Sequence, residues 1–255
     1  SDQDQWWVFA PLVERIAKPS ESPLPRFSKE PVTVVADDNV SIKFTNTDPR
    51  SGRVDSRIYL AASRMTVDLR ARLLTAPVSG TLLIENYKVS ESDERAANPR
   101  SAPFASSLGN LPSQTYVEWV DSMSLDATQT RAEFQGDVLL DYRSGMKIAL
   151  LDELATAYTF IPRGVSTVGR QTVLTCKTLV AEFAGSGSPS PAGGAGINVK
   201  DTRRFEASGG VYLEDDQFTV SADRIIKHAR SDLLAIYGRD GAGAEIHSRD
   251  GTGPT

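Results

Sequence analysis

The sequence predicts an all-β protein in which repeated antiparallel strand-turn-strand units form a curved, open roll. Three observations predict this fold class. Runs of alternating apolar and polar residues recur along the chain, turn-forming clusters separate these runs, and one pair of strands is repeated about four times. A helix is expected only near the N-terminus, where the spacing of the apolar residues changes.

The N-terminal arm, residues 1–31, is expected to lie outside the folded body. Trp7, Leu12 and Ile16 have near-helical spacing, which predicts a short helix after Pro11. The two adjacent tryptophans fit an arm packed on the domain edge or, as the less favoured alternative, an interfacial anchor beside a membrane. The Pro- and Ser-rich stretch that completes the arm predicts an extended linker.

The folded body, residues 32–255, is expected to be a β-roll of about four repeats with two flexible insertions. Residues 88–113 and 185–198 have the polar, Ser-, Pro- and Gly-rich composition typical of such insertions. Residues 146–160 fit a helical face or two strands, and two strands are favoured because the neighbouring runs are strands. The other runs predicted as strands are Val32–Ala36, Val40–Phe44, Arg57–Leu69, Thr115–Leu125, Ala132–Tyr142, Thr172–Phe183, Phe205–Leu213 and Phe218–Lys227.

Each repeat is an alternating strand followed by a strand that contains glycine. The copies align Leu60, Val117, Leu174 and Val220, then Ala62, Trp119, Cys176 and Ala222, then Met65, Met123, Leu179 and Ile225. The second strands align Gly80, Gly136, Gly209 and Gly238, and further apolar positions are Phe134, Val138, Val211, Leu213 and Phe218. A recurrent glycine inside a strand predicts a bend or bulge. Since one copy cannot bury its apolar face alone, the copies are expected to share one interior.

The composition limits the classes of function. Among 255 residues, 40% are hydrophobic and 24% charged, which is enough to bury a core. The net charge of -5 and the scattered basic residues disfavour nucleic-acid binding. The sequence contains no run of 18 apolar residues, so it predicts no membrane-spanning helix. No signal peptide is visible and the chain begins at Ser1 without Met, so we expect a piece of a longer protein, with room for a targeting segment or membrane anchor ahead of it.

No residue pattern predicts an active site, a metal site or a cofactor. The histidines, His228 and His247, lack metal-ligand spacing, and the single cysteine, Cys176, is expected to be packed rather than reactive. Nucleophile-elbow and phosphate-loop motifs are absent. The acidic groups are expected to be solvated turns or strand ends; they are Asp37-Asp38, Asp152-Glu153, Glu214-Asp215-Asp216 and the aligned Asp68, Asp126 and Glu182.

Residues Phe205–Ile226, with Leu233–Gly238 behind them, resemble the OstA-like family of lipopolysaccharide transport proteins, which includes LptA, LptC and the N-terminal domain of LptD. In that family a glycine-valine strand precedes a Leu-x-Ala-Asp strand and then an Ala-x-Gly strand. The match is good over residues 205–238, partial over 115–142 and loose over 57–87, so that it covers roughly half of the chain.

The resemblance implies a β-jellyroll or β-taco roll in the periplasm or cell envelope that takes part in outer-membrane biogenesis. Its interior would shelter acyl chains of lipopolysaccharide or a related glycolipid, and similar modules would dock edge to edge by strand addition. The residues expected to line the lipid groove are Leu60, Ala62, Met65, Val117, Trp119, Met123, Phe134, Val138, Leu174, Cys176, Leu179, Val211, Leu213, Phe218, Val220, Ala222 and Ile225. Trp119 either plugs this interior or lines it, and a plug is slightly favoured.

Two other functions stay open. A structural β-solenoid scaffold would bind proteins through its sheet edges, and a filled interior would favour it over a lipid-binding protein. A polysaccharide-acting β-helix enzyme is the weaker alternative. The equivalent residues Tyr59, Tyr116, Val173 and Phe218 are spaced by 57, 57 and 45 residues, whereas the coils of a β-helix repeat much faster.

Overall fold

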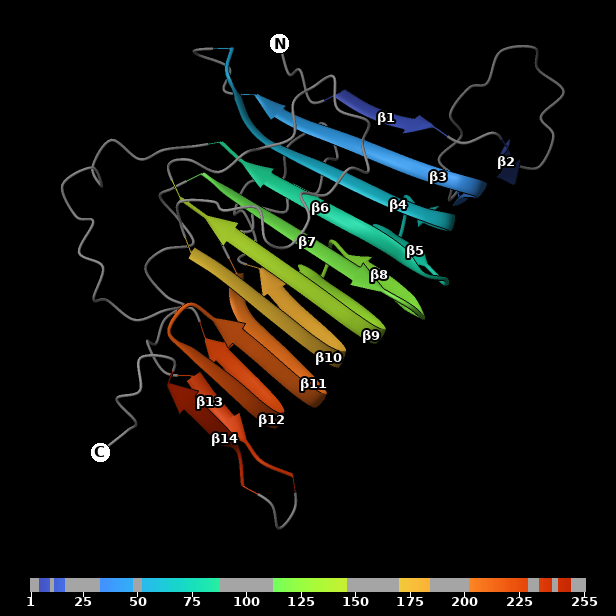
Figure 1. Cartoon of the computed structure of the whole chain (residues 1–255). Helices are drawn as coiled ribbons and strands as arrows, with labels where there is room; N and C mark the ends of the chain where they lie inside the picture. Colours follow the sequence, from blue (N-terminus) through green and yellow to red (C-terminus); the bar gives the residue numbers. More distant parts are fainter. Residues whose placement is uncertain are drawn as a thin grey trace, which may run out of the picture.

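The computed structural model describes residues 33–47, 52–87, 112–145, 170–183, 202–228, 234–239 and 243–248, and the backbone of residues 5–9 and 12–16. All regular structure in these ranges is β-strand, which confirms the predicted all-β class (Figure 1). The strands are β1 (Gln5–Phe9), β2 (Leu12–Ile16), β3 (Thr33–Thr47), β4 (Val54–Asp68), β5 (Leu73–Ala76), β6 (Gly80–Asn86), β7 (Ser113–Trp119), β8 (Ser122–Asp126), β9 (Arg131–Ser144), β10 (Arg170–Phe183), β11 (Thr202–Asp215), β12 (Phe218–His228), β13 (Leu234–Tyr237) and β14 (Glu245–Ser248).

The strands form one antiparallel sheet that consists of two halves. Long strands cross both halves: β3, β4, β9, β10, β11 and β12. Short strands pair with one half of a long strand only. β6 pairs with residues 56–62 of β4, whereas β5 pairs with residues 66–68 of the same strand. We call the part of the sheet in line with β6, β7 and β14 the β7 half, and the part in line with β5, β8 and β13 the β8 half.

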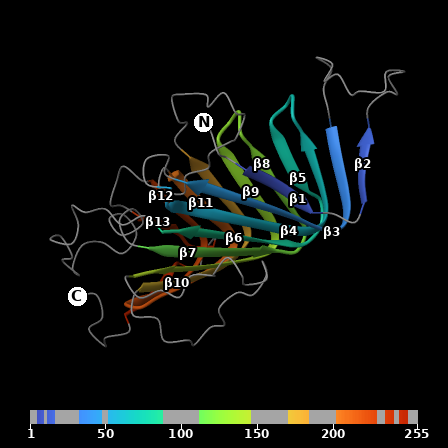
Figure 2. The ribbon, with the colours of Figure 1, turned by 90° about the horizontal axis from the view of Figure 1, so that it is seen from above.

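The long strands bend where the two halves meet. Gly136 in β9 and Gly209 in β11 have φ angles of +79° and +83° at these bends, and the pairing registers of β9 with β10 and of β11 with β12 shift there. Glycine adopts such angles at little cost because it has no Cβ atom. The prediction of glycine bulges is therefore confirmed at these two positions, and Figure 2 shows β5 and β8 diverging from β6 and β7 as a result.

The prediction of a bulge is wrong for the other two aligned glycines. Gly80 is the first residue of β6, and Gly238 follows the last residue of β13. Neither has a positive φ angle. At Gly80 the chain changes halves between two short strands, β5 and β6, so no strand has to bend at that glycine.

The strand predictions agree closely with the structure where it describes them. Two predictions are corrected. The run Thr115–Leu125 is two strands, β7 and β8, interrupted at Val120 and Asp121, and the separate runs Val32–Ala36 and Val40–Phe44 are one strand, β3, with an irregularity between them. The predicted insertion 88–113 includes Ser113, which already belongs to β7. Residues 88–111 of that insertion, the insertion 185–198 and the predicted strands in residues 146–160 lie outside the described residues.

The backbone of the N-terminal arm contains two short strands beside β3. β1 pairs with residues 41–45 and β2 with residues 33–37. The sequence predicts a short helix after Pro11 in this arm. Only the backbone of the arm is described, and the helix stays a prediction.

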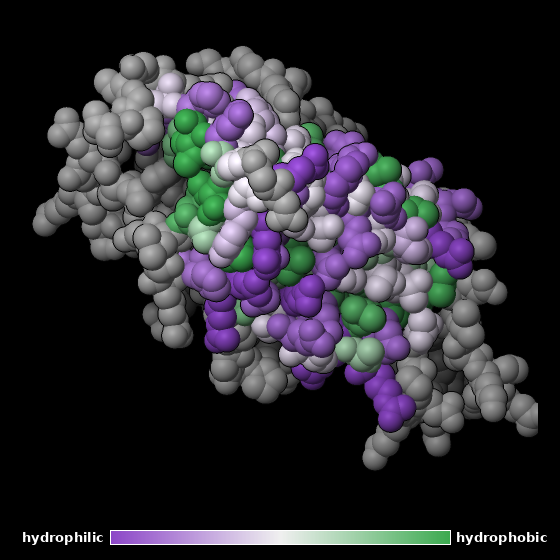
Figure 3. Space-filling model, turned by 90° about the horizontal axis from the view of Figure 1, so that it is seen from below, coloured by the Kyte–Doolittle hydropathy of each residue, from purple (hydrophilic) through white to green (hydrophobic). Residues whose placement is uncertain are grey.

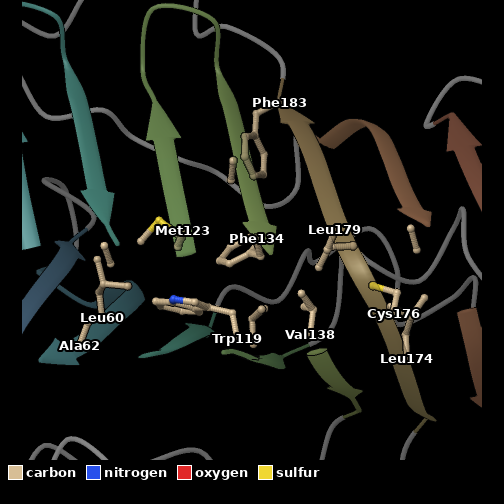
Figure 4. Packing of buried hydrophobic residues seen from close by; sticks show 14 of the residues in the cluster. Leu60, Ala62, Trp119, Met123, Phe134, Val138, Leu174, Cys176, Leu179 and Phe183 are labelled. Carbon is tan, nitrogen blue, oxygen red and sulfur yellow. The ribbon is translucent and has the colours of Figure 1, made fainter. Parts of the chain in front are cut away.

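The hydrophobic core lies between the two halves of the bent sheet. It joins residues of the β7 half, such as Leu60 and Leu174, to residues of the β8 half, such as Met123 and Leu179, in one cluster. Figure 4 shows these two groups of side chains pointing toward one another. The bend therefore lets a single sheet bury one of its own faces, as the repeat predicts.

Candidate functional site

The candidate site is the space between the two halves, and we call its inward-facing side chains the trough. All of the predicted groove residues belong to the core cluster or pack against it. All but two of them are buried, and the exceptions, Phe218 and Ala222, are partly buried. The residues that the alignment of the copies brings together therefore share one interior. The alignment does not show whether that interior holds a ligand.

The repeat corresponds to an unbroken row of apolar residues across the β7 half. Each member is the direct cross-strand partner of the next, so all of them share one face of the sheet. The row runs Ile42, Leu60, Leu82, Val117, Leu140, Leu174, Leu213 and Val220. It contains all four members of the first aligned position of the repeat, which confirms that these residues are structurally equivalent.

The opposite wall of the trough is a corresponding row in the β8 half. Its members also pair directly from strand to strand and include three of the four members of the third aligned position of the repeat. From β8 to β13 the row runs Met123, Phe134, Leu179, Ala207, Ile225 and Ile236. Ala207 and Ile225 are fully buried, whereas Ile236 at the end of the row is partly exposed.

Trp119 is the largest side chain in the trough and is completely buried. Its indole Nε1 donates a hydrogen bond of 2.8 Å to the backbone carbonyl of Val78. Its ring lies 5.5 Å from the ring of Phe134, at an interplanar angle of 51°. Trp119 lies in the β7 half and Phe134 in the β8 half, so the two rings join the walls. Of the two roles expected for Trp119, the geometry around it matches a plug.

The rims of the trough differ in polarity. At the rim of the β7 half, Ser56, Asn86, Ser113 and Ser144 are successive cross-strand partners, and they lie on the inward face because strand residues alternate between faces. At the rim of the β8 half most inward residues are apolar and partly exposed, among them Leu74, Leu125, Ala181, Phe205 and Leu234, and the buried Lys227 lies between Phe205 and Leu234. The trough is thus amphipathic from one rim to the other.

Charged residues cover the outward face of the β8 half. Arg204 forms ion pairs with Glu182 and Glu206, and Arg224 also pairs with Glu206. These side chains are partly exposed, so each pair contributes little to stability. Figure 3 shows one face of the molecule, on which hydrophilic residues surround several separate hydrophobic groups. Glu182 thus takes part in a partly exposed ion pair on this outward face, and its expected solubilising role stays a prediction.

A buried polar cluster, which was not predicted from the sequence, lies on the outward face of the β7 half. Arg143 and Asp141 form an ion pair of 2.9 Å, and each side chain is 1% exposed. Gln171 donates hydrogen bonds of 3.1 and 3.2 Å to both carboxylate oxygens of Asp141. Nearby, Tyr87 donates a hydrogen bond to Glu85, and burial together with this bond raises the pKa of the tyrosine. The sequence signal for this cluster is an alternation of charged and polar residues at strand ends. Solvent-exposed strand ends show the same alternation, so this signal does not predict burial.

The reactive residue types are dispersed. Burial raises the pKa of the Cys176 thiol to about 12, which makes it a weak nucleophile at neutral pH. His228 lies at the end of β12 in the β8 half, whereas His247 lies on β14 in the β7 half. Within the described ranges, no group of three or more His, Cys, Asp and Glu residues could hold a metal ion. The described ranges likewise contain no helix with the length and apolar character needed to cross a membrane.

The acidic groups have structural roles where they are described. Asp68 and Asp126 each accept backbone N–H hydrogen bonds in the turn that follows their strand, so they stabilise these turns. The Thr128 hydroxyl and the Gln129 backbone N–H lower the pKa of Asp126. The expectation of a solvated group is wrong for Asp215, which is 1% exposed because it lies at the end of β11 against β10 and accepts a hydrogen bond from Thr172. The group Asp152-Glu153 lies outside the described residues.

A small hollow opens at the bend beside the trough. It has a volume of about 300 Å³ and is lined by residues of β9, β10 and β11, including Asp137, Lys177 and Gly210. Lys177 and Asp137 form an exposed ion pair across it. Because the two charges offset each other, this hollow has no net charge that would select an ionic ligand.

Comparison with known proteins gives no relative from which a function could be transferred. No model of a known protein family matches the chain, and no curated protein matches it. The functional argument therefore depends on the trough itself.

Proposed function

We propose that this chain is a non-enzymatic lipid-binding protein of the cell envelope that shelters acyl chains of lipopolysaccharide or a related glycolipid in the trough. The observation that carries the proposal is the pair of continuous apolar rows on facing walls, of which one runs from β3 to β12 in the β7 half and the other from β8 to β13 in the β8 half. An acyl chain gains roughly 0.8 kcal/mol for each methylene that it buries, so a long apolar surface is the feature such a ligand needs.

The unequal rims support a ligand that is itself amphipathic. The apolar rim of the β8 half, which includes Phe205 and Leu234, is partly exposed and could contact acyl chains as they enter. At the opposite rim Ser56 and Asn86 are partly exposed, and their hydroxyl and amide groups can form hydrogen bonds to a sugar or phosphate headgroup. A purely structural core has no requirement for such a difference.

The sheet edges support the second part of the proposal, which is docking of similar modules by strand addition. β13 and β14 lie beyond β12 and pair only with that strand among the described residues. Their outer backbone groups would then pair with a strand of another module. Ile246 of β14 is the cross-strand partner of Val220 and is 49% exposed, so the row of trough residues reaches this edge.

A structural scaffold is the second candidate, because the trough is filled next to the bend. Trp119, Val138, Leu174 and Ile225 are each no more than 1% exposed. A scaffold would use its edges to bind proteins and would keep this interior dry. In the lipid-binding protein, by contrast, the two halves must separate enough to admit an acyl chain.

Photo-crosslinking with a lysophosphatidylglycerol that carries a diazirine near the end of its acyl chain separates these candidates. For a lipid-binding protein we expect crosslinks on inward residues such as Phe205, Phe218 and Leu234. Crosslinks confined to the exposed outward residues Tyr212 and Tyr237, or none above the level of a denatured control, would reject lipid binding and favour the scaffold. A lipopolysaccharide competitor then tests the glycolipid class, since it should reduce the inward crosslinks.

A further inference from the structure

The rim of the β8 half ends in hairpin turns whose backbone groups are paired with one another. Residues 69–72 join β4 to β5 and residues 127–130 join β8 to β9, and Figure 2 shows both turns at the same end of the sheet. The backbone N–H of Ala127 donates a hydrogen bond of 3.0 Å to the carbonyl of Arg72, and the β8–β9 turn is bonded in the same way to the end of β10. A partner at these turns therefore meets side chains, not the free backbone groups that strand addition requires.

Apolar side chains lead from the trough to these turns. Leu74 in β5 and Leu125 in β8 are direct cross-strand partners, and both are partly exposed on the inward face. Phe205 in β11 is partly exposed on the same face. Leu69, the first residue of the β4–β5 turn, is 60% exposed. Exposed apolar residues that gather at one end of a molecule are typical of a surface that contacts a membrane or another protein.

Three exposed arginines lie at the same rim. Arg70 and Arg72 belong to the β4–β5 turn, and Arg203 lies at the start of β11. None of the three forms an ion pair in the part of the chain that the structure describes. The aspartates that precede the two turns, Asp68 and Asp126, accept backbone N–H hydrogen bonds instead. The guanidinium groups are therefore available to an anionic partner.

This combination of exposed apolar and free basic side chains distinguishes the rim of the β8 half. The inward row at the rim of the β7 half is polar and uncharged, from Ser56 to Ser144. The other exposed large hydrophobic residues of the described ranges lie at the break between β7 and β8, on the outward face or at the sheet edge; they are Val120, Tyr212, Tyr237 and Ile246.

We infer that the rim of the β8 half is a docking surface for a bilayer that contains anionic lipids. Leu69 enters the boundary between headgroups and acyl chains, and Arg70, Arg72 and Arg203 contact lipid phosphates. The net charge of -5 does not prevent this contact, because charges more than about 8 Å away are largely screened at physiological ionic strength. The choice of a bilayer over a protein partner rests on the proposed function, since a lipid-binding protein takes its ligand from such a surface.

Co-flotation of the full chain with phosphatidylcholine vesicles, prepared with or without phosphatidylglycerol, tests the inference. We expect the unaltered chain to float with the vesicles that contain phosphatidylglycerol. The double variant Arg70→Glu with Arg203→Glu should weaken this binding at least about tenfold, and Leu69→Ser should weaken it as well. The three residues are exposed, so the midpoint of urea denaturation should stay close to that of the unaltered chain.

Matched controls make the same changes away from the rim. Lys177→Glu with Arg239→Glu reverses two exposed basic residues, one beside the bend and one after β13. Val120→Ser replaces an apolar residue that is 51% exposed at the break between β7 and β8. Both controls should float with the anionic vesicles as the unaltered chain does.

Two results would overturn the inference. One is absence of binding to the anionic vesicles, which would favour a protein partner at this rim, and the other is equal binding by the rim variants and their controls. The proposed function would survive either result if the diazirine lysophosphatidylglycerol still crosslinked to inward residues. Vesicle binding that depends on the rim, without inward crosslinks, would support docking and reject the proposed function.

Discussion

Gly80 and Trp119 are direct cross-strand partners in β6 and β7, and the indole ring occupies the space where a side chain of Gly80 would lie. Trp119 thereby restricts the position opposite it in β6 to glycine. The contact also explains a glycine at the start of β6 that has no positive φ angle and takes part in no bend.

Gly80→Ala is expected to destabilise the fold by about 3 kcal/mol, at the upper end of the usual cost of overpacking. The added methyl group would meet both the indole ring and the backbone oxygen of Ala61, at 2.4 and 2.5 Å. Urea denaturation measures the change, with Gly243→Ala as a control because a Cβ atom there has no neighbour within 4 Å. If the ring causes part of the cost, Trp119→Leu should reduce the effect of Gly80→Ala in a double-mutant cycle. Full additivity would contradict that explanation.

The two glycines at the bend of β11 should respond differently to alanine. Both have positive φ angles, +83° for Gly209 and +70° for Gly210, so each substitution incurs backbone strain of about 1–2 kcal/mol. A Cβ atom on Gly209 would also lie 2.6 Å from the Cβ atom of Lys177, whereas one on Gly210 would have no neighbour within 4 Å. We expect Gly209→Ala to lower the midpoint of urea denaturation more than Gly210→Ala does. The reverse order would show that the contact with Lys177 is not limiting.

Much of this fold could be predicted because period-two alternation and the repeat both report side-chain direction. The aligned residues Leu60, Val117, Leu174 and Val220 lie in one row of the sheet because equivalent positions in successive copies meet the same interior. The break between β7 and β8 was missed because the alternation continues on both sides of it. Val120 is apolar yet 51% exposed, so composition gave no sign of the interruption.

The lipid-lining role of these residues could not be predicted from the pattern alone. A row of aliphatic side chains has the same periodicity whether it contacts another wall or a ligand. The distinction depends on the distance between the β7 half and the β8 half, which is set by the bulges at Gly136 and Gly209 and by the size of Trp119. Pairings between such distant residues are not encoded in a local sequence window.

The buried ion pair of Asp141 and Arg143 is expected to stabilise the fold only while both partners are present. Asp141→Ala should destabilise the protein by about 3–5 kcal/mol, because it leaves a buried guanidinium without its carboxylate partner. The double variant Asp141→Leu with Arg143→Met should be less destabilised than Asp141→Ala. Arg64→Ala is the control, since the pair of Arg64 with Asp37 is exposed and contributes at most about 1 kcal/mol. Chemical denaturation of the four proteins measures these differences, and equal effects of Asp141→Ala and Arg64→Ala would contradict the prediction.

Cys176 should make the stability of the protein fall above pH 9. Burial raises the pKa of its thiol from 9.0 to about 12 in the folded state. Between these values the unfolded chain has lost the thiol proton and the folded chain retains it, so each further pH unit favours unfolding by about 1.4 kcal/mol. Below pH 9 the thiol is protonated in both states and its contribution to stability is constant.

The measurement for Cys176 is the difference in unfolding free energy between the unaltered chain and Cys176→Ala, followed from pH 8 to pH 11. Ionisation of lysines and of Tyr116, whose pKa burial raises to about 12, is common to both proteins and cancels in this difference. We expect the advantage of the unaltered chain to be constant up to pH 9 and to decrease above it. Parallel pH profiles would mean that the thiol ionises equally in both states, which requires a trough open to water at β10 rather than the closed packing in which Cys176 is 5% exposed.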